Sequence, residues 1–361
     1  MENIEEKITK SLKSLKEPYV DDNIVDSGIL KNISFEEDVL SIDLEFGFPV
    51  LEYASTVELR VKEHLKEFSS FKIEVNVNSK ILARSVQKGT KTLKEVKNVI
   101  AIASGKGGVG KSTTTANLAI ALQREGASVG VLDADIYGPS QTRMLGSQGK
   151  PESKDGKKME PIISYDIQTI SIGNLVEEDT PMIWRGPMVT GALEQLLNET
   201  AWSDLDYLLV DLPPGTGDIQ LTLCQRIPVS GSIIVTTPQD IALLDAKKAL
   251  KMFEKVNVSV LGIVENMSLY KCSECGHVEH IFGSDGGEIM SKQYGIDLLG
   301  RLPLDKKIRE DVDNGHPTTA IQPDSAVSLE YQEIGRKITA KLSLKARDHS
   351  AKFPKIVVQN T

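Results

Sequence analysis

Hydrophobic residues in the first quarter of the chain follow two different spacings. Apolar side chains recur every three or four residues over 4–15 and again over 53–68, which is typical of helices with one buried face. Three segments instead alternate apolar and polar residues, as half-buried strands do: 29–35, 39–46 and 71–77. The order of helix, two strands, helix and strand predicts a small α+β domain over residues 1–88.

From Asn98 onward, continuous apolar runs alternate with longer helical patterns. Buried strands are predicted over 98–103, 128–133, 207–211, 231–238 and 258–264. Helices are expected from Thr114, over 240–256 and over 328–342. Fully apolar strands that alternate with helices are typical of a parallel sheet covered on both faces. The predicted fold class is therefore α/β, with a doubly wound, mostly parallel sheet over 98–361 and a polar linker over 89–97.

The first buried strand runs into a glycine-rich turn and then into a helix, which is the setting of a phosphate-binding loop. The glycines let backbone N–H groups turn toward an anion, and the helix N-terminus adds partial positive charge. The pattern Gly-x-x-x-x-Gly-Lys-Ser places Lys111 near the β- and γ-phosphates and the Ser112 hydroxyl on Mg²⁺. The predicted nucleotide-binding residues are Gly105, Lys106, Gly107, Gly108, Val109, Gly110, Lys111, Ser112 and Thr113.

Two later strands end in carboxylates. Asp133 ends the strand over 128–133, Asp135 follows two residues later, and Asp211 ends the strand over 207–211. Ligands of doubly wound sheets bind at the carboxyl ends of the strands, so these side chains should lie near the γ-phosphate and its Mg²⁺. An ordinary turn-capping role is the alternative for Asp133 and Asp135. In the Pro-Pro-Gly-Thr-Gly segment over 213–217, the prolines restrict the backbone and the glycines leave it free to change conformation, as expected of a switch loop.

Composition narrows the class of partner. The chain has 361 residues, of which 40% are hydrophobic and 26% charged, and its formal net charge is -9. This acidity argues against a nucleic-acid surface as the main partner. No apolar stretch approaches the roughly 20 residues of a membrane span, and the first residues are too acidic for a signal peptide. We therefore expect a soluble, cytoplasmic protein with neither nucleic acid nor membrane as its partner.

The three cysteines cannot form a paired disulfide framework. Cys224 falls in a helical apolar pattern and is expected in the core. Cys272 and Cys275 form a Cys-x-x-Cys turn, which in a reducing compartment indicates metal or redox chemistry. Three interpretations compete: a local zinc site with His277 and His280, a redox dithiol, or a cluster held by two cysteines from each of two subunits.

The phosphate loop contains an early lysine, Lys106, and in this form it resembles the deviant Walker A motif of the MinD, ParA and nitrogenase-iron-protein class of ATPases. The resemblance implies an ATP-bound homodimer in which Lys106 reaches the partner subunit's nucleotide. It also implies catalytic roles for Lys106, Lys111, Asp135 and Asp211. Asp135 would orient the attacking water, while Ser112, Asp133 and Asp211 would surround Mg²⁺. Asn266 would contact the adenine.

Further segments resemble the Mrp/ApbC family of iron–sulfur cluster carriers with ATPase activity. The resemblance runs from about Asn98 to Pro317, through 183–188, 210–218, 235–239 and 262–268, and includes Cys272-x-x-Cys275. It implies a [4Fe-4S] cluster bound between subunits by Cys272 and Cys275, with apo-proteins as recipients and scaffold proteins as donors. This homodimer favours the shared cluster over the other two interpretations of the cysteines.

The small domain resembles, by layout and position, the iron–sulfur-assembly domain often fused in front of such ATPases. The Thr-x-x-x-Cys-Pro pattern of free-standing relatives is replaced here by Gly47-Phe48-Pro49-Val50-Leu51, so a docking or packing role is expected. Two rival functions remain: a MinD- or ParA-like positioning ATPase, and a zinc-stabilised ATPase scaffold.

Overall fold

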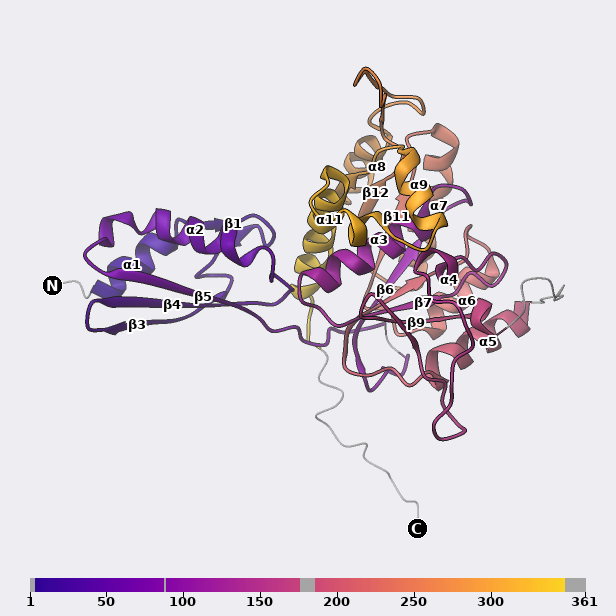
Figure 1. The fold of residues 1–361 in the computed structure, drawn as a ribbon, viewed down its shortest axis with the longest axis horizontal. Helices are drawn as coiled ribbons and strands as arrows, with labels where there is room; N and C mark the ends of the chain where they lie inside the picture. The colour runs from indigo at the N-terminus through magenta and orange to yellow at the C-terminus, as the bar shows by residue number, and fades with distance from the viewer. Residues whose placement is uncertain (1–3, 88, 176–185, 348–361) are drawn as a thin grey trace, which may run out of the picture.

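The computed structural model describes residues 4–87, 89–175 and 186–347, which form a small N-terminal domain beside a larger α/β domain (Figure 1). The predicted run over 183–188 lies largely outside these ranges, as does the end of the chain after residue 347. No helix in the described part of the chain is long and apolar enough to cross a membrane.

The small domain has the predicted order of elements. Its helices and strands are α1 (Ile4–Leu12), β1 (Lys16–Glu17), β2 (Asp22–Asn23), β3 (Leu30–Glu36), β4 (Val39–Phe46), α2 (Ala54–His64) and β5 (Lys72–Ser79). β3 and β4 pair antiparallel, and β4 pairs parallel with β5 across the α2 connection. Every second residue of β4, from Leu40 to Phe46, is buried, which confirms the period-two interpretation. The short β1–β2 pair was not predicted.

The large domain contains an eight-stranded sheet in the order β15-β12-β11-β6-β10-β7-β9-β8. Its strands are β6 (Val96–Ala103), β7 (Val129–Asp133), β8 (Ile162–Ser164), β9 (Ile167–Ser171), β10 (Leu205–Asp211), β11 (Gly231–Thr236), β12 (Val260–Glu265) and β15 (Leu298–Arg301). All neighbours pair parallel except β8 with β9. The five predicted strands are confirmed, whereas the edge strands β15 and β8 and the neighbouring β9 were missed.

Helices cover both faces of this sheet, as the doubly wound prediction requires. They are α3 (Lys111–Arg124), α4 (Gln141–Met144), α5 (Gly186–Glu199), α6 (Asp218–Arg226), α7 (Asp240–Lys255), α8 (Gly286–Tyr294), α9 (Lys306–Asp313), α10 (Thr318–Ile321) and α11 (Ala326–Ser343). Ile100 and Ile102 of β6 pack in one core with α3 and α11. Val99 and Ala101 of the same strand pack in the other core with α5, α6 and α7. Successive side chains of the central strand thus serve opposite layers.

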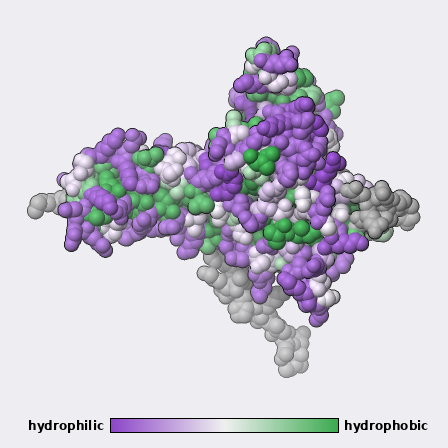
Figure 2. All heavy atoms as spheres, viewed as in Figure 1, coloured by the Kyte–Doolittle hydropathy of each residue, from purple (hydrophilic) through white to green (hydrophobic). Residues whose placement is uncertain are grey.

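The small domain contacts the far end of the helix that begins at the phosphate loop. The Leu51 N–H donates to the carbonyl of Glu125 at the end of α3 (3.0 Å), and Arg124 donates to the Glu52 carboxylate. The segment before β6 also lies on the large domain, since Gln87 Nε2 donates to the Ile227 carbonyl (2.7 Å). On the face shown in Figure 2, hydrophobic side chains lie in separate patches on a largely hydrophilic surface.

Candidate functional site

The glycine-rich loop lies at the carboxyl end of β6, between β10 and β11, where successive connections leave in opposite directions. Gly108 (φ 79°) and Gly110 (φ 82°) take the left-handed conformation that glycine adopts without strain. A Cβ on Gly105 would lie 2.1 Å from the Asp245 carbonyl carbon, and one on Gly110 would lie 2.1 Å from Asn266 Nδ2. The loop is therefore packed too closely against α7 and the end of β12 to accept side chains at these positions.

A cavity of about 200 Å³ lies over this loop and brings most of the predicted nucleotide-binding residues together. Residues 106–113 line it, with Asp135 from the segment after β7 and Pro214 from the predicted switch loop. Gly105 and Asn266 lie outside the lining. The cavity wall thus combines the phosphate loop, one acidic side chain and the segment expected to move with the nucleotide.

Beneath the cavity, Lys111 forms a buried ion pair with Asp211. Lys111 is 6% exposed and Asp211 is fully buried. Thr115 Oγ1 donates to the same Asp211 oxygen (3.2 Å), while Gln141 Nε2 donates to the other oxygen (2.8 Å). The carboxylate therefore holds the lysine ammonium beside the Ser112 hydroxyl (3.3 Å), at the start of α3.

The two carboxylates at the end of β7, Asp133 and Asp135, have different surroundings. Asp133 is fully buried and accepts hydrogen bonds from four donors: the N–H groups of Asp135, Ser140 and Gln141 and the Ser171 hydroxyl. Burial and the negative charge of Asp211 outweigh these donors and raise the pKa of Asp133 to about 7. Asp135 lines the cavity, where burial raises its pKa and the Lys111 ammonium opposes that shift. Asp135 thus lines the cavity over the phosphate loop, and Asp133 anchors the segment behind it.

The donor set beneath the cavity fits a magnesium ion. Mg²⁺ prefers oxygen ligands and retains bound waters, and Ser112, Asp133 and Asp211 supply a hydroxyl and carboxylates. Gln141 Oε1 and Ser140 Oγ are buried and have no hydrogen-bond partner among the residues that the structure describes. Sequence reasoning missed Gln141, although its position in the polar segment directly after the Asp133 strand was a usable signal.

Two predicted residues make contacts that their expected roles do not require. Lys106 Nζ donates to Gln239 Oε1 of its own chain (3.3 Å), just before α7. Asn266 Nδ2 donates to the Val109 carbonyl (2.9 Å) and is 8% exposed. Asn266 therefore supports the phosphate loop from behind. Its contact with adenine, and the reach of Lys106 into a partner subunit, remain predictions.

Cys272 and Cys275 lie on a hairpin that projects from the large domain, orange at the top of Figure 1. Its strands β13 (Tyr270–Lys271) and β14 (Val278–Glu279) pair antiparallel, and the Cys272 N–H donates to the His277 carbonyl (2.8 Å). Cys275 is exposed and Cys272 partly so. Backbone N–H groups of Cys275 and Glu274 lower the pKa of the Cys272 thiol, which favours the thiolate that metals bind.

The other cysteine and the histidines behave differently. Cys224 is buried, and burial raises its pKa to about 12, as expected of a core residue. His280 Nδ1 lies 2.8 Å from the Ser268 carbonyl. Within the described ranges, no group of three or more His, Cys, Asp or Glu side chains is arranged to hold a metal ion. The four-ligand zinc site is therefore not formed in this structure.

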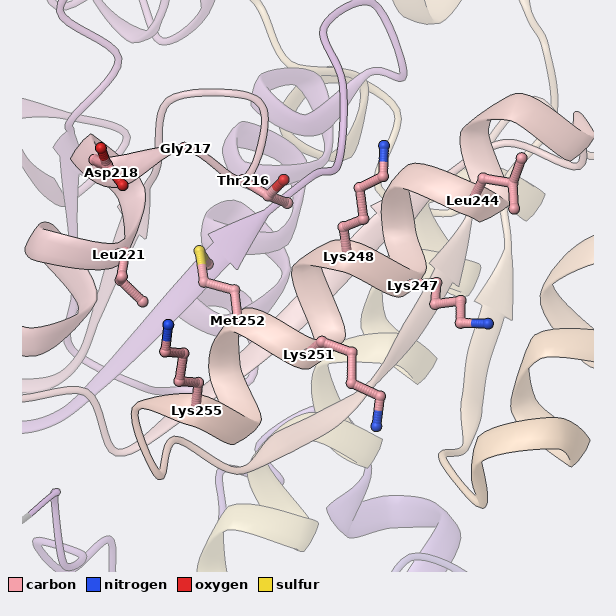
Figure 3. A pocket seen from close by; sticks show the side chains of 10 residues that line it. All are labelled: Thr216, Gly217, Asp218, Leu221, Leu244, Lys247, Lys248, Lys251, Met252 and Lys255. Atoms are coloured by element: carbon pink, nitrogen blue, oxygen red, sulfur yellow. The ribbon is translucent and has the colours of Figure 1, made fainter.

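A second hollow, of about 700 Å³, lies beside the switch loop between α6 and α7 (Figure 3). Thr216 and Asp218 lie at one end, and Leu221 and Met252 contribute apolar surface. Four lysines of α7 give this hollow a positive charge: Lys247, Lys248, Lys251 and Lys255. The surface beside the switch loop thus has the opposite sign to the chain as a whole.

Two protein-family models match the chain. Residues 95–339 match the family described as the NUBPL iron-transfer P-loop NTPase, and residues 5–77 match the iron–sulfur cluster assembly protein family. The second match covers the small domain, whose resemblance was inferred from layout and position.

Curated relatives share about half of their residues with this chain. An iron–sulfur cluster carrier protein of Pseudomonas fragi is 56% identical over 273 residues, which are 75% of this chain and 94% of the relative. The carrier protein of Escherichia coli K12 is 47% identical over 93% of this chain and 91% of its own length. The mouse iron–sulfur cluster transfer protein NUBPL is 48% identical over 73% of this chain and 83% of its own.

Solved structures agree on the fold of the large domain. A nucleotide-binding protein from Archaeoglobus fulgidus, solved with ADP, is 36% identical with a TM-score of 0.54, over 62% of this chain and 88% of its own. The Pyrococcus furiosus cell division ATPase MinD has a TM-score of 0.51 at 23% identity, over 67% of this chain and 98% of its own. The second likeness concerns the fold alone.

Proposed function

Since the chain belongs to the NUBPL iron-transfer family of P-loop NTPases, we propose that it is an ATP-hydrolysing iron–sulfur cluster carrier. Its cargo is a labile [4Fe-4S] cluster, which it accepts from a scaffold protein and transfers to apo-proteins. The observation that carries this proposal is the projecting hairpin with Cys272 and Cys275, because it presents two accessible thiols on a nucleotide-binding domain.

Two subunits would share the cluster. A four-iron cluster takes four thiolates, and one hairpin supplies two. Apolar side chains that are about half exposed or more lie on the hairpin, on the segment after it and on the helices α7 and α8: Val278, Ile281, Ile241, Leu244 and Ile289. Such exposed apolar residues favour burial against a second protein surface. Lys106 lies beside the start of α7, so a copy docked on this face would approach both the cysteines and the phosphate loop.

The nucleotide would act on the hairpin through the end of β12. Asn266 Nδ2 donates to the Val109 carbonyl of the phosphate loop. Two residues later, the Ser268 carbonyl oxygen lies 2.8 Å from His280 Nδ1. The hairpin begins at Tyr270, immediately after this segment. A shift of the phosphate loop on ATP binding would therefore reach the base of the hairpin through one short stretch of backbone.

For hydrolysis, we propose a division of roles among residues that line the cavity and residues that lie beneath it. Lys111 would exchange its Asp211 partner for the phosphates, and Asp135 would orient the attacking water. Ser112, Asp133 and Asp211 would hold Mg²⁺ and its waters. The ion would neutralise charge on the phosphates.

The double variant Cys272→Ser with Cys275→Ser tests the cluster site. After anaerobic reconstitution, we expect wild-type protein to contain iron and sulfide and to show cluster absorption, and the variant to contain neither while still binding nucleotide. Cys224→Ala is the matched control, because this buried thiol should leave the iron content unchanged. Full iron and sulfide retention in the double variant would reject the site, and zinc in place of iron would favour a zinc-stabilised scaffold.

Light scattering tests the shared cluster. Reconstituted protein with ATP should have the mass of a dimer, and Cys272→Ser with Cys275→Ser should weaken that dimer. A wild-type monomer that retains its full cluster with ATP present would contradict a cluster held between subunits.

A further inference from the structure

We propose that Gln141 is a positioning residue of the nucleotide site: it fixes the Asp211 carboxylate and offers its own carbonyl oxygen to a water of the magnesium–nucleotide complex. The proposal rests on nucleotide binding at the loop over 105–112, as in the proposed function. It assigns a role to a residue that no phosphate-loop motif includes.

The amide nitrogen of Gln141 joins two separate parts of the site. Gln141 is the first residue of α4 and is 1% exposed. Its Nε2 donates to Asp211 Oδ2 (2.8 Å) and to the Ser112 carbonyl (3.0 Å), so both amide hydrogens are used. One side chain thereby holds both Asp211 and Ser112, whose hydroxyl is a predicted Mg²⁺ ligand.

The two oxygens of Asp211 serve different partners. Oδ1 accepts from Lys111 and Thr115, and Oδ2 accepts from Gln141. When Lys111 turns toward a phosphate, Asp211 loses its charged partner. Gln141 then keeps the carboxylate in place through the oxygen that the lysine never used.

The carbonyl end of Gln141 lacks a partner. Oε1 is buried and makes no hydrogen bond with any residue in the described part of the chain. A buried acceptor left unpaired is unfavourable, so its burial here is explained if a ligand of the site supplies a donor. Water bound to Mg²⁺ is such a donor, and Mg²⁺ in proteins usually retains several waters.

The backbone of Gln141 connects this contact to the segment after β7. Its N–H donates to Asp133 Oδ2 (3.1 Å), beside the bond from the Ser140 N–H (3.0 Å). A displacement of residues 134–141 would therefore withdraw the amide from Asp211. Gln141 links the position of this segment to the magnesium side of the nucleotide.

Nucleotide binding in the full-length protein tests the role. A fluorescent ADP analogue is titrated once with excess MgCl₂ and once with EDTA. The dissociation constant in EDTA divided by the dissociation constant in MgCl₂ is the ratio that measures how much Mg²⁺ strengthens binding. We expect Gln141→Met, which keeps the side-chain size, to reduce this ratio by about tenfold, the size of one hydrogen bond to a charged group. Thr142→Val on the same helix is the control and should keep the wild-type ratio. ATP hydrolysis by Gln141→Met should show a lower kcat with a smaller change in KM.

A mutant cycle with Asp211→Asn tests whether Gln141 acts through that carboxylate. Because part of the effect of Gln141→Met acts through Asp211, the substitution should reduce the ratio less in the Asp211→Asn background than in the wild type, and an equal reduction would show that Gln141 does not act through that carboxylate. If Gln141→Met melts at a lower temperature but keeps the wild-type ratio, the residue is structural and the proposal is wrong. If Gln141→Met does not fold, Gln141→Asn, whose shorter amide cannot reach Asp211, should reduce the ratio in the same way, and an unchanged ratio there would also overturn the proposal.

The same titrations distinguish a failure of the role assigned to Gln141 from a failure of the proposed function. Wild-type protein that binds nucleotide equally well with and without Mg²⁺ would overturn both this inference and the nucleotide step of the proposed function. A magnesium-dependent wild type with an equally dependent Gln141→Met would overturn the role of Gln141 alone. Iron content in the same preparations reports on cluster binding independently of either result.

Discussion

The contact between the two domains is organised around a buried ion pair, and Arg336→Met should disrupt it. Glu125, at the end of α3, is 1% exposed, and its Oε1 accepts from Arg336 Nε at 2.7 Å. The Glu52 N–H from the small domain donates to the other oxygen (3.2 Å), and the Arg336 guanidinium lies 5.1 Å from the centre of the Tyr53 ring. Arg336 therefore stabilises both the end of α3 and the loop that docks on it.

The expected loss in the free energy of unfolding follows from the unpaired Glu125 charge that Arg336→Met leaves buried. Removal of one partner of a buried ion pair destabilises a protein by about 3–5 kcal/mol, because the other charge stays buried without compensation. Loss of the cation–π contact adds about 1 kcal/mol or less. We therefore expect the free energy of unfolding to fall by about 4 kcal/mol, a large part of the roughly 5–15 kcal/mol typical of folded proteins.

The stability that Arg336→Met loses should depend on pH. Burial already raises the pKa of Glu125 above its ordinary value, and the Arg336 charge opposes that shift. Without Arg336 the folded-state pKa rises further, so the folded protein binds a proton that the unfolded chain releases. Stability then decreases as pH rises from the unfolded pKa of about 4.5 through the folded one. The deficit of Arg336→Met relative to wild type should thus be larger at pH 8 than at pH 5.5.

Urea denaturation followed by circular dichroism measures the effect at both pH values. Arg309→Met is the matched control, because Arg309 pairs with Asp313 at an exposed position (2.7 Å) and its loss should change stability by about 0.5 kcal/mol. Adding Glu125→Gln to Arg336→Met should recover part of the loss, since it removes the unpaired charge. The reasoning is refuted if Arg336→Met and Arg309→Met lose similar stability, or if Glu125→Gln gives no recovery.

Three further results are expected. Iodoacetamide at neutral pH should alkylate Cys272 first, then Cys275, and spare Cys224 until the protein unfolds, as peptide mass spectrometry can determine; early labelling of Cys224 would contradict its burial. Lys111→Ala should lose nucleotide binding, whereas Lys106→Ala should bind nucleotide and lose turnover, measured by titration and phosphate release; unchanged turnover in both would remove the ATPase assignment. Chelation of Mg²⁺ by EDTA should abolish ATP turnover in the wild type, and readdition of MgCl₂ should restore it. Turnover that persists in EDTA would exclude the magnesium-dependent mechanism.

Much of the architecture could be predicted because its signals are local. Alternating residues define β4, and continuous apolar runs define β6, β7 and β10. Glycine spacing defines the phosphate loop, and carboxylates at the ends of parallel strands must converge at one edge of the sheet, which is why Asp135 was expected beside that loop. The strands β8 and β15 and the two strands of the cysteine hairpin were missed because they have only two to four residues, too few to establish a period, and β9 was missed because Gln168 and Thr169 interrupt its apolar residues.

Local residue patterns therefore specify the order of elements and the chemistry at the strand ends. The long-range pairings form only in the folded chain: Gln141 with Asp211, Asn266 with the Val109 carbonyl, and the small domain with the end of α3. These partners lie tens to hundreds of residues apart in the chain, and each contact depends on how whole helices pack. No spacing of residue types encodes such contacts, because their geometry arises only when distant segments exclude water together.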